Sequence, residues 1–442
     1  MNNIIEVVDA TNHLEKPDFL AKTRKVKSIR SQKLWHFLMV FGPGLIVMEA
    51  DNDAGAVSTY TQAGAQYGLH MLWVLMLLLP VTYFCQEMVV RLGIATGEGH
   101  ASMIYKRFGK WWGRFSLFDL QLVNFLTLVS EFAAISLAFS KMGISPYISV
   151  TIFAIVLIIL VTSGGYLRWE RIVVFLCLLD LIWLGLAFLP KTGFLAVLQN
   201  TVVPTSPPGG YNSAAIYLII AIVGTTVAPW QLFFQQSIVA DKKLRFLDLK
   251  SARVDTFIGA VFTVVVAGCM MLIGNVLFKR HITYEDPSQM AVVLGPILGH
   301  TAKYLILMLM VNAAVLGTVA ISLSSAYAWS EVAGWKHSLQ TKFKEAPGFY
   351  LFYAAAVLLA AGIVLIPQAP LQVIIVGVQV LAGVILPSAI IFLQILLNDK
   401  VLLGDRFVNK PWNNAINWVI IAVLFVLSFV LAAQIMLPNV FK

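Results

Sequence analysis

The chain has 442 residues, of which 59% are hydrophobic and only 12% are charged. Its mean hydropathy of +0.83 excludes a soluble globular protein, because an interior of this size could not hide so much apolar surface. The net charge of +9 does not indicate a nucleic-acid partner, since the basic residues gather in short loops between apolar segments.

Eleven apolar segments are each long enough to cross a bilayer as a helix. They are too long and too uniformly apolar for the alternating strands of a β-barrel. The segments lie at about 35–66, 69–93, 115–140, 146–163, 171–190, 213–239, 252–278, 302–330, 349–367, 371–397 and 412–437. The sequence therefore predicts an all-α polytopic membrane protein with the lipid bilayer as its surroundings. Residues 1–33 are polar, have no early apolar core of a signal peptide, and are expected to form a cytoplasmic arm.

Basic residues alternate between loops in a way that predicts the topology. If the N-terminus is inside, the inside loops hold clusters such as Lys106 to Lys110 and Lys242 to Arg245, whereas the outside loops keep few basic residues. Positive loops stay on the cytoplasmic side. We therefore expect a multi-pass protein of the inner membrane with its N-terminus in the cytoplasm and its C-terminus outside.

Two spans carry polar interruptions. The first contains Glu49-Ala50-Asp51-Asn52-Asp53-Ala54-Gly55, and the sixth contains Gly224-Thr225-Thr226-Val227-Ala228-Pro229-Trp230. Proline removes a backbone donor and breaks a helix. Paired interruptions at corresponding positions indicate a secondary transporter built from inverted repeats, with its site near the bilayer midplane.

This pattern predicts a division of the chain into five parts. They are a cytoplasmic arm at 1–33, a first repeat of five helices at 34–190, an extracellular loop at 191–212, a second repeat of five helices at 213–397, and helix 11 with the C-terminus at 398–442.

The chemistry of such breaks suits cations. Unwinding frees backbone carbonyl oxygens at the end of a half-helix, and a neighbouring carboxylate adds negative charge, so the product is a cage of oxygen ligands. A carboxylate inside a membrane is costly and is usually kept for function.

Other polar residues fall inside apolar spans. Glu131 in the third span is either a functional group or half of a buried pair. Gln379 in the tenth span could reach a midplane ion or satisfy a neighbouring helix. Gln231 and Gln235 share a helix face after Pro229 and could line a hydrated path or join helices. Asp180 and Asn312 are expected to form hydrogen bonds between helices.

Several segments resemble the NRAMP metal transporters. The resemblance rests on Gly42-Pro43-Gly44 through Asp53-Ala54-Gly55-Ala56 to Gly68 in the first span, on Gly224 to Gln236 in the sixth, on Gln379 to Pro387, and on Leu403-Gly404-Asp405-Arg406-Phe407-Val408-Asn409. It covers most of the chain. It implies a LeuT-type fold with inverted five-helix repeats and broken helices 1 and 6.

The chain departs from the family pattern at the implied site. The family's Asp-Pro-Gly-Asn reads Asp53-Ala54-Gly55-Ala56 here, and its Met-Pro-His reads Ala228-Pro229-Trp230. A further family histidine falls at Gln235, and Leu128 takes the place of an aspartate three residues before Glu131. The resemblance then implies a metal site of Asp53, the carbonyls of Ala50 and Thr225, and Gln379, with Asp51 as an extra acid and Ala228 in the wall.

The lost thioether and the oxygen ligands that remain favour magnesium, and also manganese, over softer metals. The pattern is most similar to the NRAMP-related magnesium transporter branch. We expect a facilitator that works by alternating access without proton coupling, because both histidine positions hold Trp230 and Gln235. A proton-coupled manganese or iron symporter that uses Asp53 and Glu131 is the alternative, and an organic solute carrier on the same fold is a third possibility. No cluster of catalytic groups indicates an enzyme, and no cofactor is expected beyond the transported ion.

Overall fold

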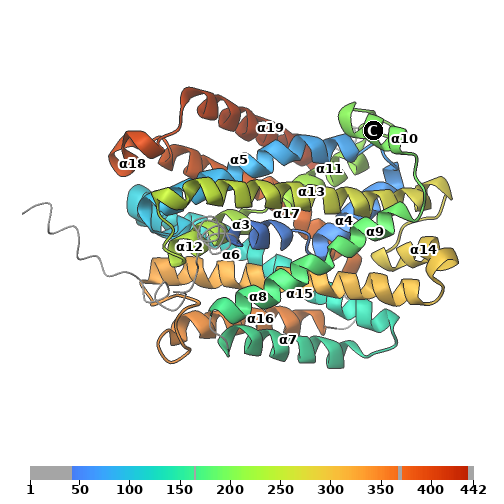
Figure 1. Cartoon of the computed structure of the whole chain (residues 1–442), viewed down its shortest axis with the longest axis horizontal. Helices are drawn as coiled ribbons and strands as arrows, with labels where there is room; N and C mark the ends of the chain where they lie inside the picture. Colours follow the sequence, from blue (N-terminus) through green and yellow to red (C-terminus); the bar gives the residue numbers. More distant parts are fainter. Residues whose placement is uncertain (1–41, 164–165, 367–370, 437–442) are drawn as a thin grey trace, which may run out of the picture. The chain divides into compact units, whose positions relative to one another are not determined.

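The computed structural model describes residues 42–163, 166–366 and 371–436, and in these ranges it contains helices and loops but no β-strand (Figure 1). The predicted arm at 1–33 lies outside the described residues. The helices in chain order are α3 (Pro43–Glu49), α4 (Ala54–Tyr67), α5 (Leu72–Thr96), α6 (His100–Lys141), α7 (Pro146–Thr162), α8 (Tyr166–Leu179), α9 (Leu181–Phe188), α10 (Phe194–Val202), α11 (Ser213–Thr226), α12 (Pro229–Asp241), η2 (Phe246–Asp248), α13 (Leu249–Lys279), η3 (Pro287–Gln289), α14 (Met290–Leu298), α15 (Thr301–Ala333), α16 (Pro347–Val364), α17 (Leu371–Leu396), α18 (Lys400–Phe407) and α19 (Pro411–Met436).

The described helices confirm a polytopic membrane protein. Nine helical segments in the described ranges are long and apolar enough to cross a membrane. The shorter apolar helix α7 and the divided pair α3 and α4 cover the remaining two predicted spans. Large apolar side chains such as Phe188 and Phe429 are 80% and 75% exposed, which is expected where lipid covers the surface.

Two predicted spans differ in detail from the structure. The third helix α6 begins at His100, before the expected start near 115, but the backbone at Gly109 is not helical (φ 85°), so a first polar helix and the apolar helix meet at a kink there. The fifth span, expected at 171–190 as one helix, is divided at Asp180 into α8 and α9. The backbone N–H of Asp180 donates to the carbonyl of Cys177, three residues earlier, instead of to the carbonyl four residues earlier as in an α-helix.

The two predicted helix breaks are confirmed. The first span stops at Glu49 and resumes at Ala54, with Asp53 as the N-cap of α4. The sixth span stops at Thr226 and resumes at Pro229, the first residue of α12. Proline is well suited to that position because its missing N–H has no helical partner there.

The inner helices bring these breaks together. Helix α4 packs along α13, α6 along α15, and α11 along α17 (Figure 1). Helices α11 and α17 touch through their backbones, because a Cβ atom at Gly224 would overlap the backbone of Gln379 and Gly383. This close approach fixes the position of Gln379 beside the sixth-span break.

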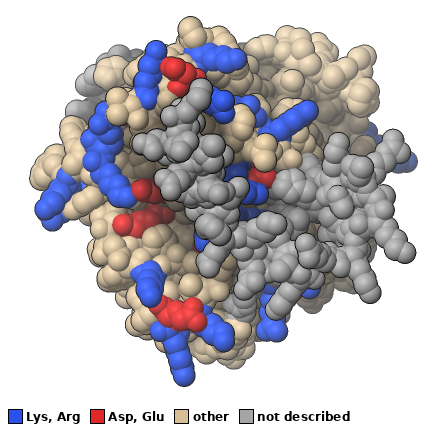
Figure 2. Space-filling model, turned by 60° about the vertical axis from the view of Figure 1, so that its left-hand side comes forward, with Lys and Arg blue, Asp and Glu red and all other residues tan. Residues whose placement is uncertain are grey.

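Lys and Arg side chains gather on one face of the molecule, at the left-hand end of Figure 1 (Figure 2). Loops far apart in the sequence meet at this end, since Arg107 forms an ion pair with Asp399. The residues come from loops that the sequence analysis placed inside the cell. Which side of the membrane this face occupies stays a prediction.

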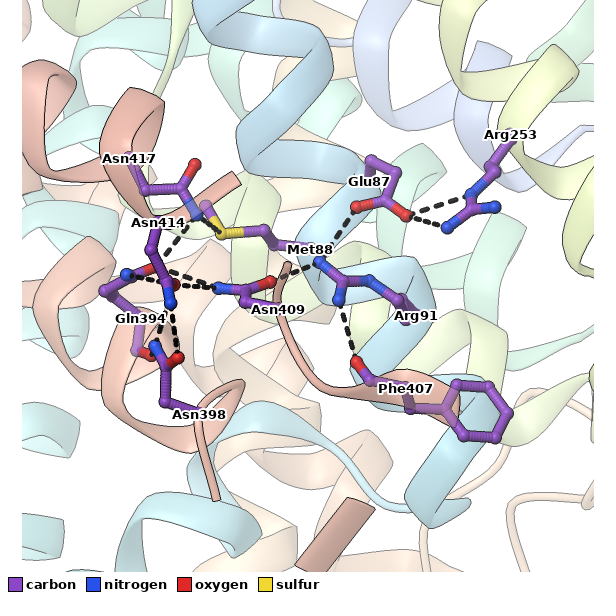
Figure 3. A network of polar contacts seen from close by, with 10 residues as sticks. All are labelled: Glu87, Met88, Arg91, Arg253, Gln394, Asn398, Phe407, Asn409, Asn414 and Asn417. Carbon is purple, nitrogen blue, oxygen red and sulfur yellow. Dashed lines mark hydrogen bonds and ion pairs between the residues drawn. The ribbon is translucent and has the colours of Figure 1, made fainter. Parts of the chain in front are cut away.

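A polar network on α5 holds the loop Leu403 to Asn409 (Figure 3). Arg91 donates to the carbonyl oxygen of Phe407 and to Asn409 Oδ1, both at 2.7 Å, and to Glu87 at 3.2 Å. Glu87 also accepts from Arg253 of α13 at 2.6 Å. Asn409 continues the network through the amides of Gln394, Asn398, Asn414 and Asn417. The last helix is therefore joined to α5 and α13 by side chains.

Candidate metal-binding site

The two helix breaks face each other inside the protein. The hydroxyl of Tyr60 on α4 lies 2.8 Å from Thr226 Oγ1 at the end of α11. Asp51, Asp53, Thr225 and Ala228 are all at most 3% exposed. The residues at the two breaks are therefore buried away from solvent.

Asp53 and Glu131 form a carboxyl pair at the start of α4. Asp53 Oδ1 accepts from the backbone N–H of Ala56 at 2.8 Å, and Glu131 Oε2 accepts from that of Ala54 at 3.1 Å. The two side chains are close enough to hydrogen bond to each other. A Cβ atom at Gly317 of α15 would lie 2.8 Å from Asp53 Cβ and 2.9 Å from Glu131 Cδ, so glycine is needed there. Both acids thus lie at the positive end of one helix, which favours negative charge.

Asp51 is a buried acid at the first-span break. Neither of its oxygens has a hydrogen-bond partner among the described residues, although the residue is 1% exposed. The Gln231 side chain faces it, but the Gln231 Nε2 atom also lacks a partner at hydrogen-bonding distance. Gln231 Oε1 instead accepts from Ala228 N and Gln86 Nε2, each at 3.1 Å. Asp51 therefore presents two free carboxylate oxygens in a buried space.

The two predicted carbonyl ligands have lost their helical partners for specific reasons. In a continuous helix Ala50 O would accept from the N–H of Ala54, but that N–H donates to Glu131. Thr225 O would accept from residue 229, which is Pro229 and has no N–H. Both carbonyl groups are available at the ends of their half-helices.

Gln379 lies at the first-span break, as the resemblance implied. A Cβ atom at Gly55 would overlap the Gln379 amide, so the side chain packs directly on this glycine. Its Nε2 atom has no hydrogen-bond partner among the described residues. The site therefore brings together Asp51, Asp53, Glu131, Gln231 and Gln379 with the chain at Ala50, Thr225 and Ala228.

The other two predicted residues make their contacts elsewhere. Gln235 Nε2 donates to Thr256 Oγ1 on α13 at 3.1 Å. The Trp230 ring packs near Phe234, with the ring centroids 6.4 Å apart, and its carbonyl accepts from Ser324 at 2.9 Å. The structure does not bring these two side chains into the group around Asp51 and Asp53, and their role in a pathway stays a prediction.

The sequence analysis missed part of the acidic region. It predicted a hydrogen bond between helices for Asp180 and Asn312, and this is confirmed at 3.1 Å. It assigned no role to Glu49, whose carboxyl lies next to that of Asp180. These acids are distant in the chain, and only the unusual charge of each inside an apolar span could have drawn attention to the pair.

Five carboxyl groups therefore lie buried in the interior, and in the described ranges none has a basic partner. None of the ion pairs among the described residues includes Glu49, Asp51, Asp53, Glu131 or Asp180. Burying unpaired charge is costly. Protons or bound cations must therefore neutralise most of the negative charge of these five carboxyl groups.

The donor set is hard in character. In the part of the chain that the structure describes, no three His, Cys, Asp or Glu side chains converge as a metal-binding cluster. The ligands that the site offers are carboxylate, amide and backbone oxygens. Such ligands suit magnesium, calcium and manganese more than soft transition metals.

Comparisons with known proteins agree with this architecture. The Nramp family model, described as natural resistance-associated macrophage protein-like, matches residues 44–434. A divalent metal cation transporter named MntH from Staphylococcus saprophyticus is 26% identical over 427 residues, which is 91% of this chain and 93% of the relative.

Solved structures show the fold. A manganese transporter of Eremococcus coleocola, crystallised with an aromatic bis-isothiourea substituted compound, has a TM-score of 0.72 at 18% identity and covers 94% of this chain and 91% of its own. MhsT in complex with L-phenylalanine has a TM-score of 0.60 at 13% identity, covering 88% and 98%. These neighbours confirm the LeuT-type fold that the sequence predicted.

Proposed function

Because this chain belongs to the Nramp family, we propose that it carries divalent metal cations across a membrane by alternating access. The observation that carries the proposal is Asp51, whose two free oxygens lie in a buried site beside Asp53 and between two broken helices. Broken helices with unwound backbone near the midplane are the usual substrate sites of such transporters.

Five groups supply the ligands in this proposal. Asp53 and Asp51 give carboxylate oxygens, Ala50 and Thr225 give backbone carbonyl oxygens, and Gln379 gives its amide oxygen after a half-turn of the amide. Ala228 forms the wall where the family pattern has methionine. Gln231 holds the backbone at Ala228 in position, because its side-chain oxygen accepts a hydrogen bond from the Ala228 N–H.

The preferred cargo is magnesium, with manganese accepted. Every proposed ligand is an oxygen atom, and magnesium keeps several waters because it dehydrates reluctantly. Ala228 and Ala56 are smaller than the methionine and asparagine of the family pattern, which leaves room for those waters. These features place the chain, in our proposal, in the NRAMP-related magnesium transporter branch.

Transport runs without proton coupling in this proposal. The membrane potential supplies about 2.3 kcal/mol per charge per 100 mV, so a divalent ion gains roughly twice that amount. Trp230 and Gln235 occupy the two family histidine positions, and neither side chain titrates. Leu128 leaves Glu131 without the second acid of the family pattern.

Proton-coupled manganese uptake is the second candidate. It is favoured by the contact between Glu131 and Asp53, because a proton held by this pair would compete with a metal at Asp53. The similar fold of the Eremococcus coleocola manganese transporter also supports manganese as the cargo.

An organic solute carrier fits the site poorly. The fold alone does not decide the cargo, but an amino-acid carboxylate would meet Asp51 and Asp53 at the helix break and be repelled by them. The acidic lining favours cations instead.

We further propose the inner membrane as the location, with the N-terminus in the cytoplasm and the C-terminus outside. The basic face of Figure 2 then lies on the cytoplasmic side. The two repeats are the segments 34–190 and 213–397.

Metal selectivity in proteoliposomes tests the proposed cargo. We expect the purified protein to take up Mg²⁺ and Mn²⁺, and Cd²⁺ to compete only weakly. Ala228→Met adds a soft ligand to the wall and should strengthen Cd²⁺ competition by about tenfold, equal to about 1.4 kcal/mol. Ala240→Met, farther along α12, is the matched control and should change nothing. Strong Cd²⁺ competition in the unmodified protein would contradict the preference for hard cations.

A further inference from the structure

A second pair of acids lies outside the site described above. Glu49 is the last residue of α3, and Asp180 separates α8 from α9. Both are 0% exposed. Their carboxyl groups are close enough for a hydrogen bond to each other.

This pair is incomplete as it stands. Two ionised carboxylates only accept hydrogen bonds and repel each other, so they can lie together only when one is protonated or a cation lies between them. Glu49 Oε1 accepts from Asn52 Nδ2 at 3.2 Å, and Asp180 Oδ1 accepts from Asn312 Nδ2 at 3.1 Å. The second oxygen of each acid has no hydrogen-bond partner among the described residues.

The two amides provide an independent indication of a ligand. Asn52 is 0% and Asn312 is 8% exposed, yet the side-chain oxygen of each is buried without a partner in the described structure. If either amide rotates by a half-turn, its oxygen takes the place of its NH₂ group and then faces the same space as the acid. The same four side chains are only partly hydrogen-bonded as they stand, and they can supply oxygen ligands when a cation enters.

The surrounding backbone supports the same interpretation. The span that contains Asp180 is interrupted there, and interrupted helices inside a membrane occur where they are buried in protein or line a cavity. The carbonyl of Leu176 accepts from Asn312 at 3.1 Å, and that of Thr263 accepts from Asn52 at 3.4 Å. Helices α3, α8, α13 and α15 thus contribute to one polar group.

Asp51 connects this group to the first site. It interacts electrostatically with Asp53 on one side and with Glu49 on the other. The acids therefore form a continuous series from Asp53 through Asp51 and Glu49 to Asp180. A cation that leaves Asp53 does not have to cross an uncharged interval to reach Asp180.

We propose that Glu49 and Asp180, together with the amide oxygens of Asn52 and Asn312, form a second binding site for the divalent cation. The ion occupies it after leaving Asp51 and Asp53, and the two sites share one path. This inference rests on the proposed transport function, but the binding experiment below separates the two.

Equilibrium dialysis of radiolabelled Mn²⁺ against the full chain in detergent counts the sites directly. We expect two equivalents for the unmodified protein. Asp180→Asn should retain only the equivalent at Asp53, Asp53→Ala should retain only the equivalent at Asp180, and the double variant should bind none. Asp119→Asn removes an acid on α6 that is bonded to Ser388 outside both sites, and it should still bind two.

The outcomes distinguish the two proposals. Two equivalents in Asp180→Asn, or a single equivalent in the unmodified protein, would overturn the second site. An unchanged count in Asp53→Ala would instead overturn the first site and leave the second one standing.

A gain-of-affinity variant covers the case in which Asp180→Asn does not fold. Asn312→Asp adds a third carboxylate to the group and should tighten the second equivalent about tenfold. Unchanged affinity in a monodisperse preparation of this variant would also overturn the proposal.

Discussion

At the scale of single residues, the site depends on acids whose charge no basic side chain balances. Asp53 is the acid at the position that the family resemblance marks as a ligand, and it is held by the backbone N–H of Ala56. The carbonyls of Ala50 and Thr225 lose their helical partners for two different reasons. The carboxylate of Glu131 accepts the N–H of Ala54, and Pro229 has no N–H. Pro229 is a local signal, but Glu131 lies 77 residues from Ala54 in the chain, and only the packing of α6 against α4 brings it there. The family resemblance, and not the local sequence, implied the two carbonyls as ligands.

The first prediction concerns Asp53. We expect Asp53→Ala to reduce Mg²⁺ and Mn²⁺ uptake by at least about tenfold, because even second-shell partners of metal ligands contribute that much to affinity. The variant should keep a normal gel-filtration profile, since removing one of several unbalanced buried charges does not break an ion pair. Asp119→Ala, outside the site, serves as the control and should transport normally. Undiminished uptake by Asp53→Ala would remove this residue from the site.

The pairing of Glu49 with Asp180 could not be predicted in the same way. The two residues are far apart in the chain, and each looks like an isolated acid within its own apolar segment. Only the packing of α3 against α8 brings them into contact. Pairings of this kind depend on helix positions that hydrophobicity does not determine.

At the scale of helices, the breaks that a proline or an acidic run signals in the local sequence were predictable, and the break without such a signal was not. Pro229 and the acidic run around Asp53 signalled the breaks of the first and sixth spans. The break at Asp180 has no proline or glycine. There Asn312 of α15 donates to the carbonyl of Leu176, which a continuous helix would pair with the N–H of Asp180. The helix that precedes the kink of α6 at Gly109 lies outside the apolar segment, and hydrophobicity therefore did not indicate it.

The network on α5 gives a prediction at this scale. Arg91→Ala would leave the buried Asn409 side chain and the Phe407 carbonyl without a donor, so the loop before α19 should loosen. We expect a loss of about 1–3 kcal/mol in stability, observed as a lower unfolding temperature of the protein in detergent.

A matched control separates this effect from a general loss of charge. Lys106 pairs with Glu98 at the surface, with its side chain 62% exposed, and such exposed pairs contribute about 0–1 kcal/mol. The unfolding temperature of Lys106→Ala should therefore be close to that of the unmodified protein. Equal unfolding temperatures for Arg91→Ala and Lys106→Ala would show that the network does not anchor the last helix.

At the scale of the whole molecule, the central claim is that a divalent cation moves alone. Proton coupling needs a titratable route away from the metal site, and a histidine is the usual choice because its pKa lies near neutrality. The two family histidine positions carry Trp230 and Gln235 here, and the Gln235 amide is bonded to Thr256. Glu131 remains beside Asp53, but Leu128 stands where the family pattern continues the acidic route.

The most direct measurement follows metal and protons in the same vesicles. Proteoliposomes that contain the purified protein, a trapped metal indicator and a trapped pH dye are given an inward Mg²⁺ or Mn²⁺ gradient at a clamped membrane potential. We predict that the metal enters while the lumen pH stays constant, and that Glu131→Gln leaves the lumen pH equally constant. Acidification of the lumen that accompanies metal entry and disappears in Glu131→Gln would contradict the account and identify the protein as a proton-coupled symporter.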